Sequence, residues 1–392
     1  MGLFDFLKSS SSSSRSNDPL SRLKQELRNC GWANTVDGII CDYRVPASVL
    51  SDVVTYGDCT TRSIAAQSEN IFVDTLVRLA DDSEACVRES VASNPLTPET
   101  VVARLSRDSD SDVRSGAAHN PMVSTDILTR LAREESWSIR SRVAINASTP
   151  SNVIERLSKD EDAFVRKYVA WNKATPSYIL DTLLKDDKDD VRERAAWNPM
   201  LSASAISKSI ESDDIAILKG ISTNTALTNS QIEMLMANEQ HRGTIYRGLA
   251  GNPATPESAL IHLAKWRDGD TRGSVARRKH APEHILDILA NDTEEDVRDY
   301  VACNSTAPTR LLAKLANDPE ARVRATVAKN PITPVEILRK LNQMSPRPVY
   351  SLAWNLATPT DILESLSYYT DNSDVRCAAL LNLATNGQMP SI

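Results

Sequence analysis

Residue patterns that could support catalysis or metal binding are scarce in this sequence. His280 and His284 have the spacing of two metal ligands, but Pro282 lies between them and no third ligand is evident. No two cysteines form a C-x-x-C pair, and neither a G-x-x-x-x-G-K-[ST] phosphate loop nor a G-x-S-x-G nucleophile motif occurs. We therefore expect no enzyme activity, no metal site and no cofactor.

Arginine recurs at one position of a 26-residue pattern, six residues before a recurring asparagine. The position is filled by Arg62, Arg88, Arg114, Arg140, Arg166, Arg192, Arg272, Arg298, Arg324 and Arg376. A column of guanidinium groups could bind phosphate, or each could pair with acidic residues of the repeat's turn, such as Asp108. Because the column keeps the phase of the apolar core, we favour the structural interpretation. We expect the asparagines to satisfy backbone groups in the same way.

Aromatic and basic residues gather where the repeats differ from one another. Positions one and four or five before the asparagine share one face of a helix, and stacked repeats would join these faces into a strip. In chain order this strip contains Arg142, Lys167, Tyr168, Trp171, Arg194, Trp197, Lys219, Arg247 and Arg277, and the adjacent Arg278 is added to the candidate partner-binding residues. Aromatic and arginine side chains dominate binding hot spots. The strip is thus a candidate surface for an acidic partner segment, with packing between repeats as the alternative for Trp171 and Trp197.

These positions recur because the chain itself repeats. Asparagines stand at 94, 120, 146, 172 and 198, and the phase continues with small irregularities through 224, 252, 304, 330, 355 and 382. Residues 94–120 show one unit, in which Thr97 as N-cap and Pro98 at the first helical position begin a helix. Val101, Val102 and Leu105 give that helix an apolar stripe, and Val113 and Ala117 do the same for a second helix.

A helix pair this short cannot bury its apolar face alone, so neighbouring pairs must stack. The phase makes thirteen units between Asp42 and Asn382. We therefore predict an all-α fold, an α-solenoid of about thirteen 26-residue two-helix repeats. At ordinary helix-packing distances it would form a curved rod on the order of 100–130 Å along its path. The pattern does not determine which row of helices lines the concave side.

The N-P-x-T-P opening and the V-R-x-x-V-A-x-N close of each unit resemble the bacterial leucine-rich repeat variant proteins and short HEAT-like repeats. The resemblance covers roughly Asp42 to Asn382. It implies a helical-repeat architecture and a binding role without shared catalytic residues. Some variant-repeat proteins add a cysteine-rich iron–sulfur segment, but Cys30, Cys41 and Cys59 lack cluster-type spacing, so this cofactor is not expected.

Three segments are expected: an amphipathic N-terminal peptide with a Ser-rich linker (1–17), an N-terminal capping helix (18–41), and the solenoid with a C-terminal cap (42–392). In the first segment the apolar residues lie on one side of a helical wheel, which suits weak peripheral membrane contact or docking to a protein. They are Leu3, Phe4, Phe6 and Leu7.

The composition narrows the function further. A net charge of -7 argues against general coating of nucleic acid, and the apolar runs are too short to span a membrane. We expect a cytoplasmic, non-catalytic scaffold that binds another protein along the solenoid surface. The alternative is a helical-repeat protein that binds nucleic acid through the basic and aromatic strip of the middle repeats. A third hypothesis, a base-excision type of enzyme, would need Trp171, Trp197 and Asp181 in one pocket.

Overall fold

The computed structural model describes residues 18–29, 42, 44–369 and 371–385, and within these ranges every regular element is a helix. Helix α1 (Pro19–Asn29) is followed by thirteen helix pairs, so the predicted all-α repeat fold is confirmed. The first helices of the pairs are α3 (Ala47–Tyr56), α5 (Val73–Leu79), α7 (Glu99–Leu105), α9 (Thr125–Leu131), α11 (Ser151–Leu157), α13 (Ser177–Leu183), α15 (Ala203–Ile210), α17 (Asn229–Met236), α19 (Glu257–Leu263), α21 (Glu283–Leu289), α23 (Thr309–Leu315), α25 (Val335–Asn342) and α27 (Thr360–Tyr369). The second helices are α4 (Cys59–Gln67), α6 (Ala85–Ser93), α8 (Ser111–His119), α10 (Trp137–Ile145), α12 (Ala163–Trp171), α14 (Asp189–Trp197), α16 (Ile215–Ser222), α18 (Arg242–Gly251), α20 (Gly269–Ala276), α22 (Glu295–Cys303), α24 (Ala321–Lys329), α26 (Val349–Trp354) and α28 (Ser373–Thr385).

The apolar stripes bury each helix pair as the sequence predicts. In the pair α7 and α8, the stripe residues Val101, Val102 and Leu105 are buried, as is Val113. The predicted start of α7 is wrong by one residue, since Pro98 is the N-cap and the helix begins at Glu99. The buried hydroxyl of Thr97 does not cap α7 but donates to the Val91 carbonyl at the end of the preceding helix, at 2.6 Å.

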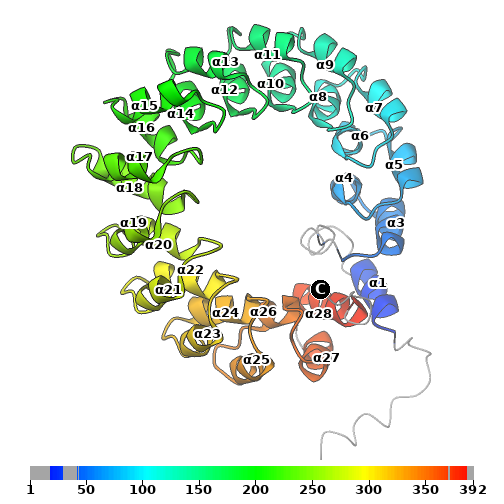
Figure 1. The fold of residues 1–392 in the computed structure, drawn as a ribbon. Coiled ribbons are helices and arrows are strands. Elements are labelled where there is room, and N and C mark those ends of the chain that lie inside the picture. The colour runs from blue at the N-terminus through cyan, green and yellow to red at the C-terminus, as the bar shows by residue number, and fades with distance from the viewer. Residues whose placement is uncertain (1–17, 30–41, 43, 370, 386–392) are drawn as a thin grey trace, which may run out of the picture.

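The curved rod expected from the sequence bends so far that the repeats form a closed ring (Figure 1). Each second helix packs against the second helix of the next repeat, whereas the first helices mostly contact their own partners. In Figure 1 the second helices form the inner row of the ring and the first helices the outer row. This tighter spacing along the inner row produces the curvature, because the outer helices splay apart around it.

Helix α1 closes the ring, where the sequence suggested only a cap for one end. Leu23 and Leu27 of α1 are fully buried in a core cluster that also contains residues of α28. On this side Glu26 accepts a hydrogen bond from Nε of Arg376 at 2.7 Å. Toward the first repeat, Lys24 forms an ion pair with Asp52 at 3.2 Å. The helix therefore joins the two ends of the solenoid.

An asparagine ladder runs along the inner row, as the sequence predicts. In each of eleven repeats the asparagine Nδ2 donates to two carbonyl oxygens of the preceding repeat, over 2.7–3.3 Å. Asn146, for example, donates to the carbonyls of Ala118 and Asn120 and accepts from the amide of Ser148. Ten of the eleven asparagines also accept from a backbone amide two residues later, so each of these ten satisfies backbone groups in two repeats at once.

The arginine column is structural, which confirms the interpretation favoured from the sequence. In eight repeats the arginine Nε donates to a carboxylate in the turn of the next repeat, over 2.6–3.1 Å. Arg88 pairs in this way with Asp108, and the bond lowers the pKa of the Asp108 carboxyl. The last arginine of the column, Arg376, finds its carboxylate on α1 as Glu26. The arginine column thus continues across the closure of the ring.

No helix in the described ranges is long and apolar enough to cross a membrane.

Candidate partner-binding surface on the inner row

The exposed side of the inner row carries the predicted strip. On α12 the side that carries Val165, Val169 and Ala170 is buried, so the opposite side of the helix faces the inside of the ring. On that side Trp171 keeps 37% of its surface exposed. The question left open by the sequence is therefore answered: the second helices line the concave side.

Four predicted residues come together on α12 and α14. The rings of Tyr168 and Trp171 stack with centroids 5.9 Å apart and planes at 5°, and Trp197 meets Trp171 edge-on at 6.4 Å. The guanidinium carbon of Arg194 lies 4.5 Å from the Trp171 ring centroid and 5.4 Å from that of Trp197. Cation–π attraction holds the arginine head against both rings. We call these four residues the aromatic cluster.

Two neighbouring aromatic residues were not predicted from the sequence. Trp137 begins α10 and Phe164 lies in the first turn of α12, with ring centroids 5.4 Å apart. They are 47% and 54% exposed. A signal was present, because both stand eight or nine residues before an asparagine of the ladder. Phe164 lies about two helical turns before Trp171, and Trp137 about two turns before Ile145, so each belongs to the same face of its helix.

Three basic residues of the predicted strip are paired within the chain. Lys167 contacts Asp190 at 2.7 Å, Lys219 contacts Glu193 at 2.8 Å, and Arg247 lies 3.4 Å from Asp268. The bond from Lys167 lowers the pKa of Asp190. These side chains are neutralised pairs and not free cations, so the strip has fewer free positive charges than its sequence suggests.

Arg278 is also not a free surface residue. It occupies the asparagine position of its repeat, and its Nη1 donates to the carbonyls of Ala250 and Asn252 at 3.2 and 2.6 Å. Burial lowers the pKa of Arg278. Its guanidinium therefore takes the place of an asparagine side chain in the ladder, and Arg278 is not part of the candidate surface.

Other aromatic and basic residues near Arg278 in the sequence belong to separate parts of the structure. Trp266 packs edge-on against the buried Tyr246 at 4.7 Å, and Arg272 belongs to the arginine column through Asp292. Arg277 is exposed and lies over the Tyr300 ring, at 4.3 Å. In the described part of the chain no carboxylate lies within ion-pair distance of Arg142, Arg194 or Arg277. These three are the cations of the strip that remain available.

The pocket needed by the enzyme hypothesis is not assembled. Asp181 lies on α13 in the outer row, where it accepts a hydrogen bond from Ser202 at 2.9 Å, while Trp171 and Trp197 lie on inner helices.

His284 faces Glu257 at 3.5 Å. Among the described residues no three His, Cys, Asp or Glu side chains are grouped to hold a metal ion. The predicted membrane-contacting residues Leu3, Phe4, Phe6 and Leu7 lie outside the described residues.

Comparison with known proteins finds similarity among solved structures alone, since no protein-family model and no curated protein matches the chain. A leucine-rich repeat variant is 21% identical over 58% of this chain and 84% of its own, with a TM-score of 0.35. Kap95p, solved with RanGDP, is 13% identical over 95% of this chain and 60% of its own, with a TM-score of 0.29. A designed armadillo repeat protein, solved with the peptide (KR)4, is 13% identical over 80% of this chain and 99% of its own, with a TM-score of 0.11.

Proposed function

We propose that this protein is a non-catalytic scaffold that binds an acidic segment of another protein on the inner face of its ring, over α10, α12 and α14. The scaffold is proposed to act in the cytoplasm. The described cysteines support a reducing compartment, because Cys59, Cys86, Cys303 and Cys377 are all free thiols.

The environment of Arg194 carries the proposal. Most arginines of the structure have a carboxylate partner, whereas Arg194 has two tryptophan rings and no ion pair within the described residues. Its Nε is buried, and no hydrogen-bond acceptor for it lies in the described part of the chain. The terminal nitrogens Nη1 and Nη2 of Arg194 are not buried in this way and make no hydrogen bond within the described residues, so they are the donors that an incoming acceptor can reach.

An acidic side chain would complete this site. A carboxylate can accept two parallel hydrogen bonds from a guanidinium, and the flanking rings already hold the Arg194 head in place. The partner would also cover Trp171 and Phe164, whose exposed faces supply apolar area. Large aromatic area around a preorganised arginine is the composition of a binding hot spot.

The same contacts weigh against nucleic acid as the partner. Phosphate binding needs several free cations along one path. On the inner face near the aromatic cluster, Lys167 and Lys219 are instead neutralised by Asp190 and Glu193. A short acidic segment needs fewer free cations than a nucleic-acid backbone, so we favour the protein partner.

Fluorescence anisotropy on the full chain tests the proposal. The probes are a labelled peptide rich in Glu and Asp, the same peptide with Gln and Asn in their place, and a labelled single-stranded DNA. We expect the acidic peptide to bind tightest. The double variant Trp171→Ala, Trp197→Ala and the single variant Arg194→Ala should each weaken its binding by about 2 kcal/mol, roughly thirtyfold.

Tyr178→Ala provides the matched control. Tyr178 is 57% exposed on α13, which lies between α12 and α14 in sequence but in the outer row. Its loss should leave peptide binding unchanged. If the tryptophan variant melts several degrees lower and still binds the acidic peptide, these residues are packing residues and the site is wrong. If DNA binds tightest with a steep salt dependence, the nucleic-acid alternative replaces this proposal.

A further inference from the structure

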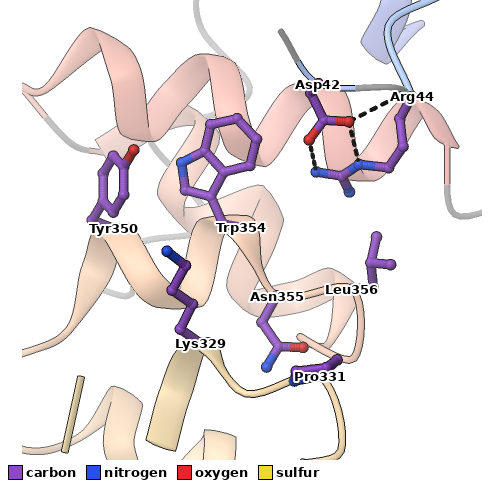
Figure 2. A pocket seen from close by; sticks show the side chains of 8 residues that line it. All are labelled: Asp42, Arg44, Lys329, Pro331, Tyr350, Trp354, Asn355 and Leu356. Atoms are coloured by element: carbon purple, nitrogen blue, oxygen red, sulfur yellow. Dashed lines mark hydrogen bonds and ion pairs between the residues drawn. The ribbon is translucent and has the colours of Figure 1, made fainter. Parts of the chain in front are cut away.

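A cavity of about 380 Å³ lies where the two ends of the solenoid meet (Figure 2). Asp42 and Arg44 line it from the segment before α3, and Tyr350 and Trp354 line it from α26. Lys329, at the end of α24, and Asn355 add to the polar lining. The cavity is remote in sequence from the aromatic cluster, so a ligand in it would bind independently of the proposed acidic partner.

Two hydrogen-bond donors in the lining have no acceptor among the described residues. The Arg44 side chain is only 5% exposed, and its Nε and Nη2 donate to Asp42 at 2.8 and 2.9 Å. Its Nη1 is buried without such a partner, and Figure 2 shows this nitrogen turned away from Asp42. The indole Nε1 of Trp354 is likewise buried and has no acceptor among the described residues. Unsatisfied buried donors are rare in native structures and indicate an absent acceptor.

The charges of the lining define that acceptor. Asp42 and Arg44 neutralise each other, and Lys329 adds one positive charge that no described carboxylate pairs with. The lining therefore carries one excess positive charge, which a single carboxylate would balance. A carboxylate would form a charge-assisted hydrogen bond with the Lys329 ammonium.

The remaining surface of the cavity suits a flat, apolar body. The rings of Tyr350 and Trp354 lie 6.2 Å apart at 51°, and the Arg44 guanidinium carbon lies 5.8 Å from the Trp354 ring centroid. Pro331 and Leu356 add apolar walls. A cavity of this size, with a few polar groups among aromatic and aliphatic walls, is typical of small-molecule sites.

We propose that this cavity binds a small aromatic monocarboxylate. The carboxylate pairs with the Lys329 ammonium, on the side of the Trp354 ring where Figure 2 shows the indole nitrogen, and the aromatic body lies against Tyr350 and Trp354. Because the lining comes from both ends of the chain, the bound molecule bridges those ends. Ligand that binds only the closed form stabilises that form by mass action.

Isothermal titration calorimetry on the full chain tests the site with indole-3-acetate. We expect one saturable site, and at least tenfold weaker binding of both indole-3-acetamide, which lacks the charge, and acetate, which lacks the ring. Lys329→Gln should weaken indole-3-acetate binding five- to tenfold. Lys265→Gln, an exposed lysine in the turn after α19, is the matched control and should not change it.

Hydrogen exchange tests the bridging role in the same samples. Saturating indole-3-acetate should slow amide exchange in α1 and α28 severalfold and leave α10 to α14 unchanged. No saturable binding of indole-3-acetate overturns the site. Equal affinity for the acid and the amide, or full affinity in Lys329→Gln, shows that the cavity does not select an anion and also overturns it. Binding without any change in exchange at α1 and α28 rejects the bridge.

Discussion

Removing the buried leucines of α1 should open the ring and leave its repeats folded. Leu23 and Leu27 are fully buried against α28 and the first repeats. Replacing a buried leucine by alanine costs about 3 kcal/mol, so the double variant Leu23→Ala, Leu27→Ala should weaken closure by about 6 kcal/mol if the two effects add. A loss of this size reduces the ratio of closed to open molecules by a factor of about 10⁴.

Small-angle X-ray scattering and hydrogen exchange measure this opening. The double variant should show a larger radius of gyration and faster exchange in α1, α3 and α28, with unchanged exchange in α10 to α14. Helical circular dichroism should fall only slightly, because each remaining repeat keeps its neighbours. Leu96→Ala is the control, since Leu96 is 40% exposed and far from the closure.

Two results would refute this reasoning. An unchanged radius of gyration and unchanged exchange would show that α1 does not hold the ring closed. Loss of most helical signal would show that the repeats depend on closure and do not fold through neighbour contacts. The pair Glu26 and Arg376 gives an independent check, because Glu26→Arg should weaken closure and the charge swap Glu26→Arg, Arg376→Glu should restore part of it.

Three further predictions concern the stability of the ring. Asn146→Ala should lower the free energy of unfolding by about 3 kcal/mol in urea titrations, because two carbonyls and an amide lose their partner, whereas the exposed Asn291→Ala should have little effect. Gly220→Ala should destabilise by about 1–3 kcal/mol, since a Cβ there would lie 2.1 Å from a backbone oxygen of the neighbouring helix, while Gly251→Ala, with open space around it, should be neutral or stabilising in the same thermal-melt comparison. The hydrogen bond from Arg88 lowers the pKa of Asp108 in the folded state, so the contribution of this pair to stability is complete above the unfolded value near 3.8 and is lost as pH falls through the lower folded pKa. In urea titrations the free energy of unfolding should change little between about pH 5 and 7 and fall steeply below about pH 4. This fall should be shallower in Asp108→Asn.

The local structure could be predicted from the sequence because it depends on contacts that recur at a fixed spacing. The apolar stripe of Val101, Val102 and Leu105, the asparagine ladder and the pairing of Arg88 with Asp108 each involve residues of one repeat and its neighbour. Thirteen copies of the same pattern make such contacts visible without an alignment. The meeting of Trp171 with Trp197 follows from the same spacing, since they occupy one position in successive repeats.

Closure of the ring could not be predicted in this way. It depends on the angle between successive repeats, and a change of a few degrees per repeat decides between a ring and an open superhelix after thirteen steps. We attribute differences in that angle to close approaches in the inner row, such as Gly220 against Glu193 and Gly248 against Ser222, which vary from repeat to repeat. Nor did the pattern reveal that Glu26 completes the arginine column, because α1 lies outside the repeat phase.

The joining of the two ends changes how the repeats share their stability. In a linear array each terminal repeat has one neighbour, so fraying begins there and proceeds inward. Here α1 gives α28 a second neighbour, and the array resembles a one-dimensional Ising chain with a periodic boundary. The first repeat to unfold must then break two interfaces, which raises the cost of initiation and makes unfolding more cooperative than in an open array of equal length. The position of the chain termini selects the joint at which the circle opens, and a circular permutant that begins at another turn would keep every repeat beside the same neighbours.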